Sequence, residues 1–245
     1  MAGVRTNGIV IKQSDFGEGD RMLHIFTEDF GIIKAVSRGA RKLKSKSGSS
    51  SQFLCYGAFD FFCGGEIWNI NSFTPKESFE PLQYDFVKLS LANYFCELCF
   101  IFLDYQNPDK MILRLFLNTL YACAYKEVSP KSLKLSFELK ILCFSGFHPK
   151  TDCCSCSNEE IYAFDIVSGN VTCKDCNTPT SITITQESLL FFRYIVCCDV
   201  KKLFSYKIPK ESESELAYIA EKFLFRHADK DIKSLEYYKA VATGG

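Results

Sequence analysis

The sequence predicts an α+β protein with a small N-terminal β-barrel, followed by a mainly helical region that carries an inserted metal-binding segment. Three observations support this fold class. Short segments rich in β-branched and aromatic residues fill positions 6–73, long apolar runs with helical spacing follow, and two C-x2-C pairs interrupt those runs. We expect a barrel domain at residues 1–80 and a helical domain at residues 81–245, with the insertion at about 148–180.

Five strands account for the N-terminal region, and the residues between the first two, 14–20, are expected to form a loop because glycines and acidic residues cluster there. The five expected strands cover residues 6–12, 21–27, 31–37, 53–62 and 66–73. Five short antiparallel strands favour the OB-fold, a small barrel that binds oligonucleotides.

The connection after the third strand is basic and rich in serine and glycine. From Lys34, inside that strand, to the middle of the connection there is no acidic residue and there are six cations: Lys34, Arg38, Arg41, Lys42, Lys44 and Lys46. Cations on a flexible loop beside a barrel suit a polyphosphate backbone, because they displace counterions without requiring a sequence. The alternative is a solvated loop that is basic by chance. Since the chain carries no net charge, any basic surface must be local.

Aromatic residues of the expected fourth strand offer a second nucleic-acid feature. Phe53, Tyr56 and Phe59 could stack on bases, although aromatic residues at strand spacing more often belong to a core.

Helices are expected at about 84–103, 109–125, 130–145 and 185–198, with Ser129 and Thr185 as caps. A capping box at residues 212–215 is expected to begin the next helix, and the residues from 226 onward to form a weakly ordered tail. Cys96 and Cys99 lie within an apolar helix, so core packing is favoured over thiol redox chemistry. Core packing is also expected of Cys123, Cys143, Cys197 and Cys198.

Four cysteines have the spacing of a structural zinc site. Cys153 and Cys156 form one C-x2-C pair, and Cys173 and Cys176 form a second pair after sixteen intervening residues. Two such pairs supply four thiolates to one tetrahedral Zn2+ and leave no position for a reactive water. Alternatives are that Cys154 or His148 replaces one ligand, or that these are ordinary buried thiols.

No enzymatic machinery is visible. The chain has no phosphate-binding loop, no dinucleotide-binding glycine pattern and no nucleophile elbow, and three histidines offer little acid–base chemistry. The N-terminus shows no export signal, and the apolar run at 91–103 is short for a bilayer span, so a cytoplasmic location is expected.

Several segments resemble the RecO family of bacterial DNA repair and recombination proteins. They are residues 8–12, 18–23, 31–42 and the Gly-Phe-His-Pro sequence at 146–149 ahead of the cysteines. The resemblance implies a nucleoid-associated recombination mediator rather than an enzyme. Such a protein binds single- and double-stranded DNA, anneals complementary strands and, with RecR, helps to load RecA onto DNA coated with single-strand binding protein.

The resemblance also implies roles for individual residues. The six cations named above match the phosphate-contacting region, and Cys153, Cys156, Cys173 and Cys176 match the zinc cysteines. The resemblance further implies that the protein engages the C-terminal tail of single-strand binding protein. A competing hypothesis is a zinc-ribbon module that docks onto proteins and has no nucleic-acid role.

Overall fold

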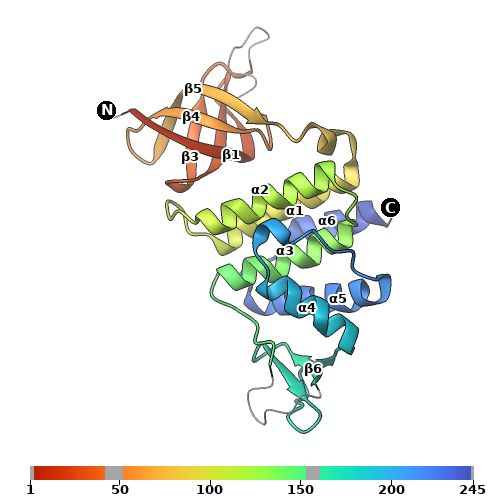
Figure 1. The fold of residues 1–245 in the computed structure, drawn as a ribbon. Coiled ribbons are helices and arrows are strands. Elements are labelled where there is room, and N and C mark those ends of the chain that lie inside the picture. Colours follow the sequence, from red (N-terminus) through yellow and green to blue (C-terminus); the bar gives the residue numbers. More distant parts are fainter. Residues whose placement is uncertain (1–2, 42–51, 153–160, 244–245) are drawn as a thin grey trace. The chain divides into compact units, whose positions relative to one another are not determined.

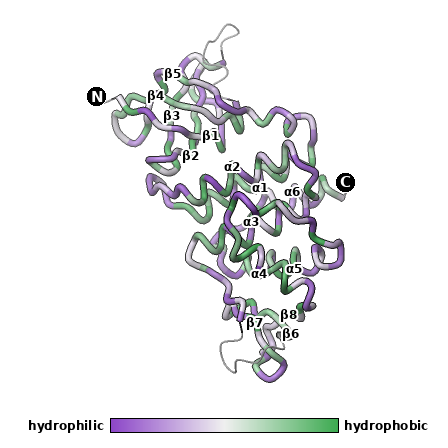
Figure 2. Tube along the Cα trace, viewed as in Figure 1, coloured by the Kyte–Doolittle hydropathy of each residue, from purple (hydrophilic) through white to green (hydrophobic). Residues whose placement is uncertain are grey.

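The computed structural model describes residues 3–41, 52–152 and 161–243. The chain divides into two compact units, Met1–Leu113 and Arg114–Gly245. Figure 1 shows the strands of the first unit and the helices of both, coloured along the sequence. Hydrophobic positions recur along the strands and the helices in Figure 2, as expected for elements that each bury one face.

Unit 1 begins with a closed five-stranded barrel in the order β1-β2-β3-β5-β4. Its strands are β1 (Gly3–Phe16), β2 (Asp20–Thr27), β3 (Gly31–Ser37), β4 (Tyr56–Phe62) and β5 (Ile67–Glu77). All neighbouring strands are antiparallel except β3 and β5, which are parallel. The predicted barrel is confirmed, and its five-stranded arrangement is consistent with an OB-fold.

Two rows of paired residues cross β1, β2 and β3 on opposite faces of the sheet. The row in the barrel interior consists of Val10, Ile25 and Ile33. The adjacent row points outward and is also fully buried, with Ile9, Phe26 and Ile32 all 0% exposed. Other residues therefore cover this part of the outer surface of the barrel.

The segment that follows the barrel covers this outer surface. It comprises the 3-10 helix η2 (Glu80–Tyr84) and helix α1 (Phe86–Phe102), which packs on β1. Asp85 begins α1, because its side chain accepts a hydrogen bond of 3.0 Å from the Lys88 amide. After α1 the chain returns to β3, where the Gln106 amide donates to the Ile32 carbonyl at 3.2 Å.

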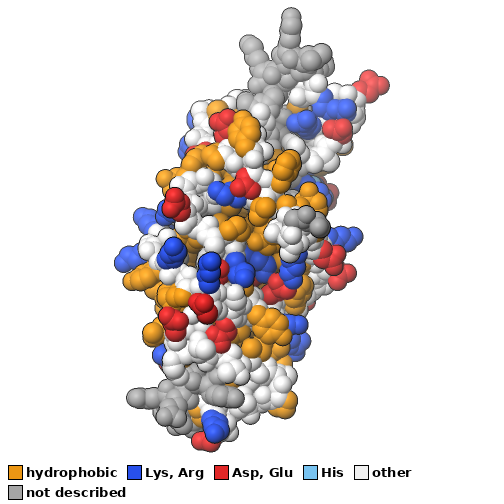
Figure 3. All heavy atoms as spheres, turned by 90° about the vertical axis from the view of Figure 1, so that its right-hand side faces the viewer, with side chains coloured by type: hydrophobic (Ala, Val, Ile, Leu, Met, Phe, Trp, Pro, Cys, Tyr) orange, Lys and Arg blue, Asp and Glu red, His pale blue; other side chains and the backbone are white. Residues whose placement is uncertain are grey.

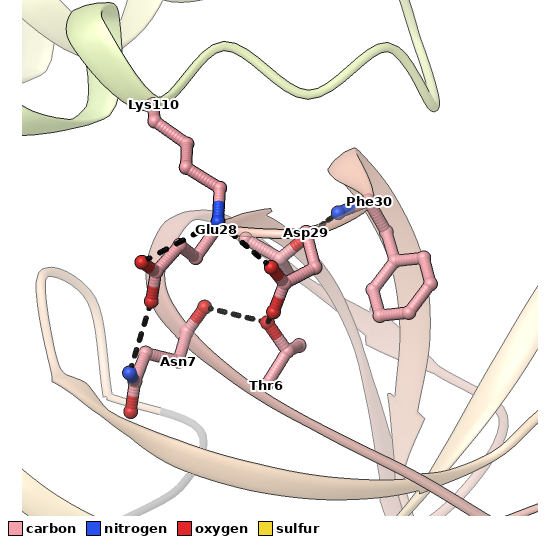
Figure 4. A network of polar contacts seen from close by, with 7 residues as sticks. Thr6, Asn7, Glu28, Asp29, Phe30 and Lys110 are labelled. Carbon is pink, nitrogen blue, oxygen red and sulfur yellow. Dashed lines mark hydrogen bonds and ion pairs between the residues drawn. The ribbon is translucent and has the colours of Figure 1, made fainter.

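The turn between β2 and β3 is tied to the start of helix α2 (Lys110–Tyr125), as Figure 4 shows. Lys110 Nζ lies 3.2 Å from Asp29 Oδ1 and 3.8 Å from Glu28 Oε1. The Thr6 hydroxyl donates to Asp29 at 2.7 Å. Hydrogen bonds from Thr6 and Lys110 hold the pKa of Asp29 below its usual value.

Gly31 allows the close approach of this connection. It has a φ of +63°, and a Cβ atom there would lie 2.4 Å from the backbone oxygen of Asn107. Any larger residue would push the segment after α1 away from the barrel.

Unit 2 contains the remainder of α2, four further α-helices and a small sheet. The elements are α3 (Pro130–Phe144), β6 (Ile161–Asp165), β7 (Asn170–Cys173), β8 (Ser181–Thr183), α4 (Gln186–Cys197), η3 (Val200–Lys202), α5 (Lys210–His227) and α6 (Lys233–Ala242). Helix α3 is central, because every residue from 132 to 142 is buried and both α4 and α5 pack against it. The predicted caps of α3 and α4, Ser129 and Thr185, are confirmed.

The small sheet has the order β7-β6-β8. Strand β8 was not expected from its short sequence, and it pairs with β6 through residues Ser181–Thr183. Asp165 closes the turn after β6, accepting hydrogen bonds from the amides of Val167 and Ser168. Burial opposes ionisation of Asp165, but these bonds and one from Thr180 outweigh it and lower its pKa.

Two sequence expectations about ordinary chain segments are wrong. Residues 14–16 are not a loop but extend β1, paired with the start of β2, because ladder hydrogen bonds form regardless of side-chain polarity and only 17–19 make the turn. The segment after 226 is not a weakly ordered tail, because it folds as α6 with Leu235 and Tyr238 buried.

The predicted capping box is also wrong, because α5 begins at Lys210, before Ser212. The two glutamates of the predicted box, Glu213 and Glu215, instead accept hydrogen bonds at the starts of other helices. Glu213 accepts hydrogen bonds from the hydroxyls of Ser129 and Ser132 beside α3. Glu215 accepts one of 2.9 Å from the Thr185 amide at the start of α4. Carboxylates at helix N-termini are favourable wherever they originate in the chain.

Candidate nucleic-acid interface

Three of the six cations predicted to contact phosphate lie among the described residues. Lys34 is exposed on β3, and Arg38 and Arg41 are exposed just beyond its end. The other three predicted cations, Lys42, Lys44 and Lys46, lie outside the described residues, as do the neighbouring residues of the basic connection.

The start of the basic connection is held against the end of the β1–β2 hairpin. The Gly39 amide donates to Asp20 Oδ1 at 2.7 Å, and the Arg41 amide donates to the Gly19 carbonyl at 3.1 Å. The Arg41 side chain lies 3.4 Å from Asp15, but both side chains are solvent-exposed. An exposed pair of this kind contributes about 0–1 kcal/mol, so a phosphate can replace the carboxylate at little cost.

Strand pairing brings a second lysine beside Lys34. Lys12 on β1 lies opposite His24 on β2, and His24 lies opposite Lys34 on β3. The two lysines are thus two strand spacings apart, roughly 10 Å on the backbone. Both are exposed, and neither forms an ion pair with a described carboxylate. We call Lys12, His24 and Lys34 the cation row.

His24, the middle residue of the cation row, also contacts the segment that covers part of the barrel's outer surface. Its ring contacts Phe100 and Tyr105 edge-on, with centroid distances of 5.5 and 6.2 Å. Its Nδ1 is buried without a hydrogen-bond partner among the described residues. Burial, followed by the charges of Lys12 and Lys34, lowers the pKa of His24. The local potential is therefore positive, which favours an anion.

Several other described cations of unit 1 are engaged with acidic groups. Lys110 is held by Glu28 and Asp29, and Arg5 lies 3.7 Å from Asp60. The Nε of Arg38 donates to the neutral side chain of Asn69 at 3.2 Å, so its charge is not offset. On the face shown in Figure 3, basic and acidic side chains are interspersed and do not form one continuous basic patch. Any anion site in unit 1 is therefore local, and the cation row with Arg38 is its best candidate.

The three aromatic residues considered for base stacking differ in exposure. Phe59 is 0% exposed and packs on Phe61 and Phe73 in the barrel core, so it cannot reach a base. Tyr56 is half-buried with Lys76 Nζ 5.9 Å from its ring centre. Phe53 is half-buried at the wall of a pocket.

Two of the four predicted zinc ligands lie in the small sheet of unit 2. Cys173 ends β7 and is buried, and Cys176 follows in a turn closed by a 3.2 Å hydrogen bond from its amide to the Cys173 carbonyl. A turn of this kind brings its first and fourth residues close together, which fits two thiolates bound to one ion. Cys153 and Cys156 lie outside the described residues, as does Cys154.

Both chain segments that flank residues 153–160 are attached to β7. On one side, the Lys150 amide donates to the Gly169 carbonyl at 2.8 Å, and the Val171 amide donates back to Lys150 at 3.1 Å. On the other side, Ile161 pairs with Cys173 itself. The described residues alone contain no group of three or more metal-binding side chains. A complete site would need both cysteine pairs.

Cys96 and Cys99 do not form a thiol redox centre. Cys96 and Cys99 are buried in α1, and burial raises the pKa of both thiols, the opposite of what a reactive thiolate requires. Core packing is confirmed for them and for Cys123. It is wrong for Cys197, which is exposed at the last turn of α4.

Comparison with known proteins covers nearly the whole chain. The family model described as Recombination protein O N terminal matches residues 1–79, and the one described as Recombination protein O C terminal matches residues 83–236. The chain belongs to the recombination protein O (RecO) family. The resemblance stated from sequence segments alone is thereby confirmed.

Curated relatives extend this RecO family assignment over full chain lengths. The DNA repair protein RecO of Caldicellulosiruptor saccharolyticus is 32% identical over 244 residues, which cover 98% of this chain and 100% of the relative. The DNA repair protein RecO of Acetivibrio thermocellus is 28% identical over 247 residues, which cover 98% of each chain. No helix in the described part of the chain has both the length and the apolar character needed to cross a membrane.

Proposed function

We propose that this protein is a non-enzymatic, DNA-binding recombination mediator in DNA repair. It binds single- and double-stranded DNA through the barrel and anneals complementary strands. With RecR, it helps to load RecA onto DNA coated with single-strand binding protein. Support comes from its membership of the RecO family and from relatives that are named DNA repair proteins. The role places the protein in the cytoplasm, at the nucleoid.

The observation that carries the proposal is the local arrangement of cations on the barrel. Lys12 and Lys34 flank His24 on one outward face, and Arg38 follows at the end of β3. None of these three cations is neutralised by a described carboxylate. Phosphates of a nucleic-acid backbone would meet them without displacing a described carboxylate, and binding would release counterions.

Salt dependence of DNA binding tests this proposal. Replacing Lys12, Lys34 and Arg38 by Gln should weaken binding of oligothymidine at low salt. It should also reduce the magnitude of the slope of log K against log salt by about 2, because each lost phosphate contact contributes about 0.7 for a single strand. Fluorescence anisotropy over a salt series measures both quantities.

A matched variant controls for loss of charge elsewhere. Lys126, Lys201 and Lys207 are also exposed and lie in unit 2, and replacing these three by Gln should leave the slope unchanged. If the unsubstituted protein fails to bind DNA, or binds with a flat salt response, the proposal is refuted. Capture of protein partners alone would then favour the zinc-ribbon docking module.

We also propose that Cys153, Cys156, Cys173 and Cys176 hold one structural Zn2+. The turn at Cys173–Cys176 and the attachment of both flanking segments to β7 support this assignment. When bound, such an ion cross-links its four thiolates and adds its binding free energy to folding. The ligands lie in unit 2, whereas the cation row lies in unit 1, so the ion has an architectural role.

Metal analysis tests the zinc assignment. The purified protein should contain one zinc per chain, and the Cys173→Ser/Cys176→Ser variant should contain none. The Cys197→Ser variant provides the control, because Cys197 is an exposed thiol outside the proposed ligand set. Chelation should lower the melting temperature of the unsubstituted protein but not that of the double variant. Zinc that persists in the double variant would contradict the assignment.

A further inference from the structure

A pocket of about 310 Å³ opens in unit 1 beside the β1–β2 hairpin. Its polar wall comes from Gln13 and Arg21 on the β1–β2 hairpin, Gln52 after the basic connection, and Gln83 in η2. The apolar part comes from Phe53, Leu54 and Leu89. Segments far apart in sequence thus converge on a single small cavity.

The lining combines hydrogen-bonding groups of both kinds with an aromatic ring. Each glutamine amide can donate and accept, the Arg21 guanidinium only donates, and no carboxylate lines the pocket. The side chains of Gln52 and Gln83 form no hydrogen bond with any described residue. The edge of a nucleobase offers the matching mixture of donors and acceptors, and its face stacks on aromatic and apolar groups.

The pocket adjoins the cations that we assign to phosphate binding. Arg21 lies opposite Ser37 on β3, and Arg38 is the next residue along the chain. Arg41 is held by its amide to Gly19, in the turn of the same hairpin. A nucleic-acid backbone that contacts Arg38 and Arg41 would therefore lie along the same hairpin that supplies Arg21 to the pocket.

Two exposed aromatic residues follow closely after Gln83 in the sequence. Tyr84 and Phe86 are 79% and 77% exposed, the two highest values among the large hydrophobic side chains described. They offer stacking surfaces for bases next to the pocket, since base–aromatic stacking requires only an accessible face.

We propose that this pocket binds one unstacked nucleobase of single-stranded DNA. The inference rests on the proposed DNA-binding function and deepens it by adding a base subsite to the phosphate contacts. The volume lies at the low end of the roughly 300–1,000 Å³ typical of small-molecule sites, which suits one base rather than a larger ligand. A base within a duplex is paired and stacked, so it cannot enter, and the pocket distinguishes single strands from duplexes.

A cycle that combines pocket substitutions with removal of the bases tests the proposal. The double variant Phe53→Leu/Gln83→Leu removes the ring and one amide but retains every charge and the apolar volume. Its affinity for oligothymidine should fall about tenfold, within the range expected for the loss of one base–aromatic contact. Its affinity for an abasic oligonucleotide of the same length should not change, nor should its affinity for a duplex. The salt slope should also stay constant, because no phosphate contact is removed.

The Asn93→Leu variant is the control, because Asn93 is an exposed amide on α1 that does not line the pocket. It should bind oligothymidine as the unsubstituted protein does. An equal loss for the base-bearing and abasic oligonucleotides, or no loss at all, would overturn the pocket while leaving DNA binding intact. If the unsubstituted protein binds neither oligonucleotide, the proposed function itself fails, and the two failures are therefore distinguishable.

Discussion

A single inserted residue creates the cation row. Val10 lies opposite Ile25, but the next pair is Lys12 with His24, because the register shifts at Ile11. Without this bulge, Lys12 would lie opposite Leu23, a residue of the barrel core. The sequence pointed to Lys34 through its basic neighbours. Lys12 and His24 could not be found in this way, because cross-strand neighbours depend on register, and a bulge leaves no composition signal.

Protonation of His24 should destabilise the protein at mildly acidic pH. The native pKa of His24 is lowered from 6.5, so the unfolded chain binds more protons than the folded chain as the pH falls below 6.5. Stability is therefore fully present above pH 6.5 and decreases as the pH falls below 6.5. Replacing His24 by Phe should reduce this loss, by no more than about 1 kcal/mol, because the residue is only partly buried. Urea unfolding at a series of pH values measures the effect.

The pH range in which stability is lost distinguishes the contribution of His24 from those of the carboxylates. Asp29 and Asp165 have a pKa lowered from 3.8, so the stability that they contribute is lost only at lower pH. His227 also has a pKa lowered by burial and by Arg226, and it provides a background slope that remains in the variant. An unchanged slope in His24→Phe would contradict the prediction.

Helix positions followed from the sequence, whereas the contacts between helices did not. Ser129 and Thr185 were identified as caps because capping is local. The partners of Glu213 and Glu215 lie at other helices, more than 25 residues away in sequence. The local sequence pattern alone therefore predicts a capping box that the structure does not contain. The apolar residues of α6 were overlooked for a related reason. Charged residues surround Leu235 and Tyr238, and only packing within unit 2 makes the helix stable.

A buried ion network links α3 with α5. Lys134 and Glu138 are 5% and 0% exposed, and Lys134 Nζ lies 2.7 Å from Glu138 and 2.8 Å from Glu221. Burial would lower the pKa of Lys134, but the two carboxylates outweigh burial and raise it. Lys134 therefore stays charged, and its positive charge offsets the cost of burying the Glu138 carboxylate.

Substitution of Lys134 by Met should destabilise the protein by about 3–5 kcal/mol, because Glu138 would remain buried without its cation. The double variant Lys134→Met/Glu138→Leu should recover most of this loss, since it removes both charges. Lys131→Met, at an exposed position on the same helix, should change the free energy of unfolding by less than about 0.5 kcal/mol. Urea denaturation measures all three. A double variant as unstable as the single variant would refute the role assigned to charge.

At the scale of the whole molecule, the sequence predicted the order of the parts but not the layer that covers the barrel. The change from strand to helix patterns was visible near residue 80, and β5 ends at Glu77. The outward row of Ile9, Phe26 and Ile32 alternates with an inward row, so the sequence cannot say which row faces the core or that both are buried. Burial of the outward row depends on α1 and on Tyr105, where the chain returns to the barrel and forms a bridge with Ile32.

We therefore expect a barrel fragment that ends at residue 107 to fold cooperatively and a fragment that ends at residue 80 to fail to do so. The shorter fragment exposes three large side chains of the outward row, each contributing about 1.5–3 kcal/mol when buried. Their sum approaches the total stability of a small domain, about 5–15 kcal/mol. The longer fragment keeps α1, the Tyr105 bridge to Ile32 and Asn107 against Gly31. We expect it to melt cooperatively, whereas the shorter fragment should bind a hydrophobic dye and melt without a sharp transition. Replacing Ile9, Phe26 and Ile32 by Thr in the shorter fragment should abolish dye binding, which attributes the exposed surface to this row. A shorter fragment that melts as sharply as the longer one would show that the five strands alone form the domain.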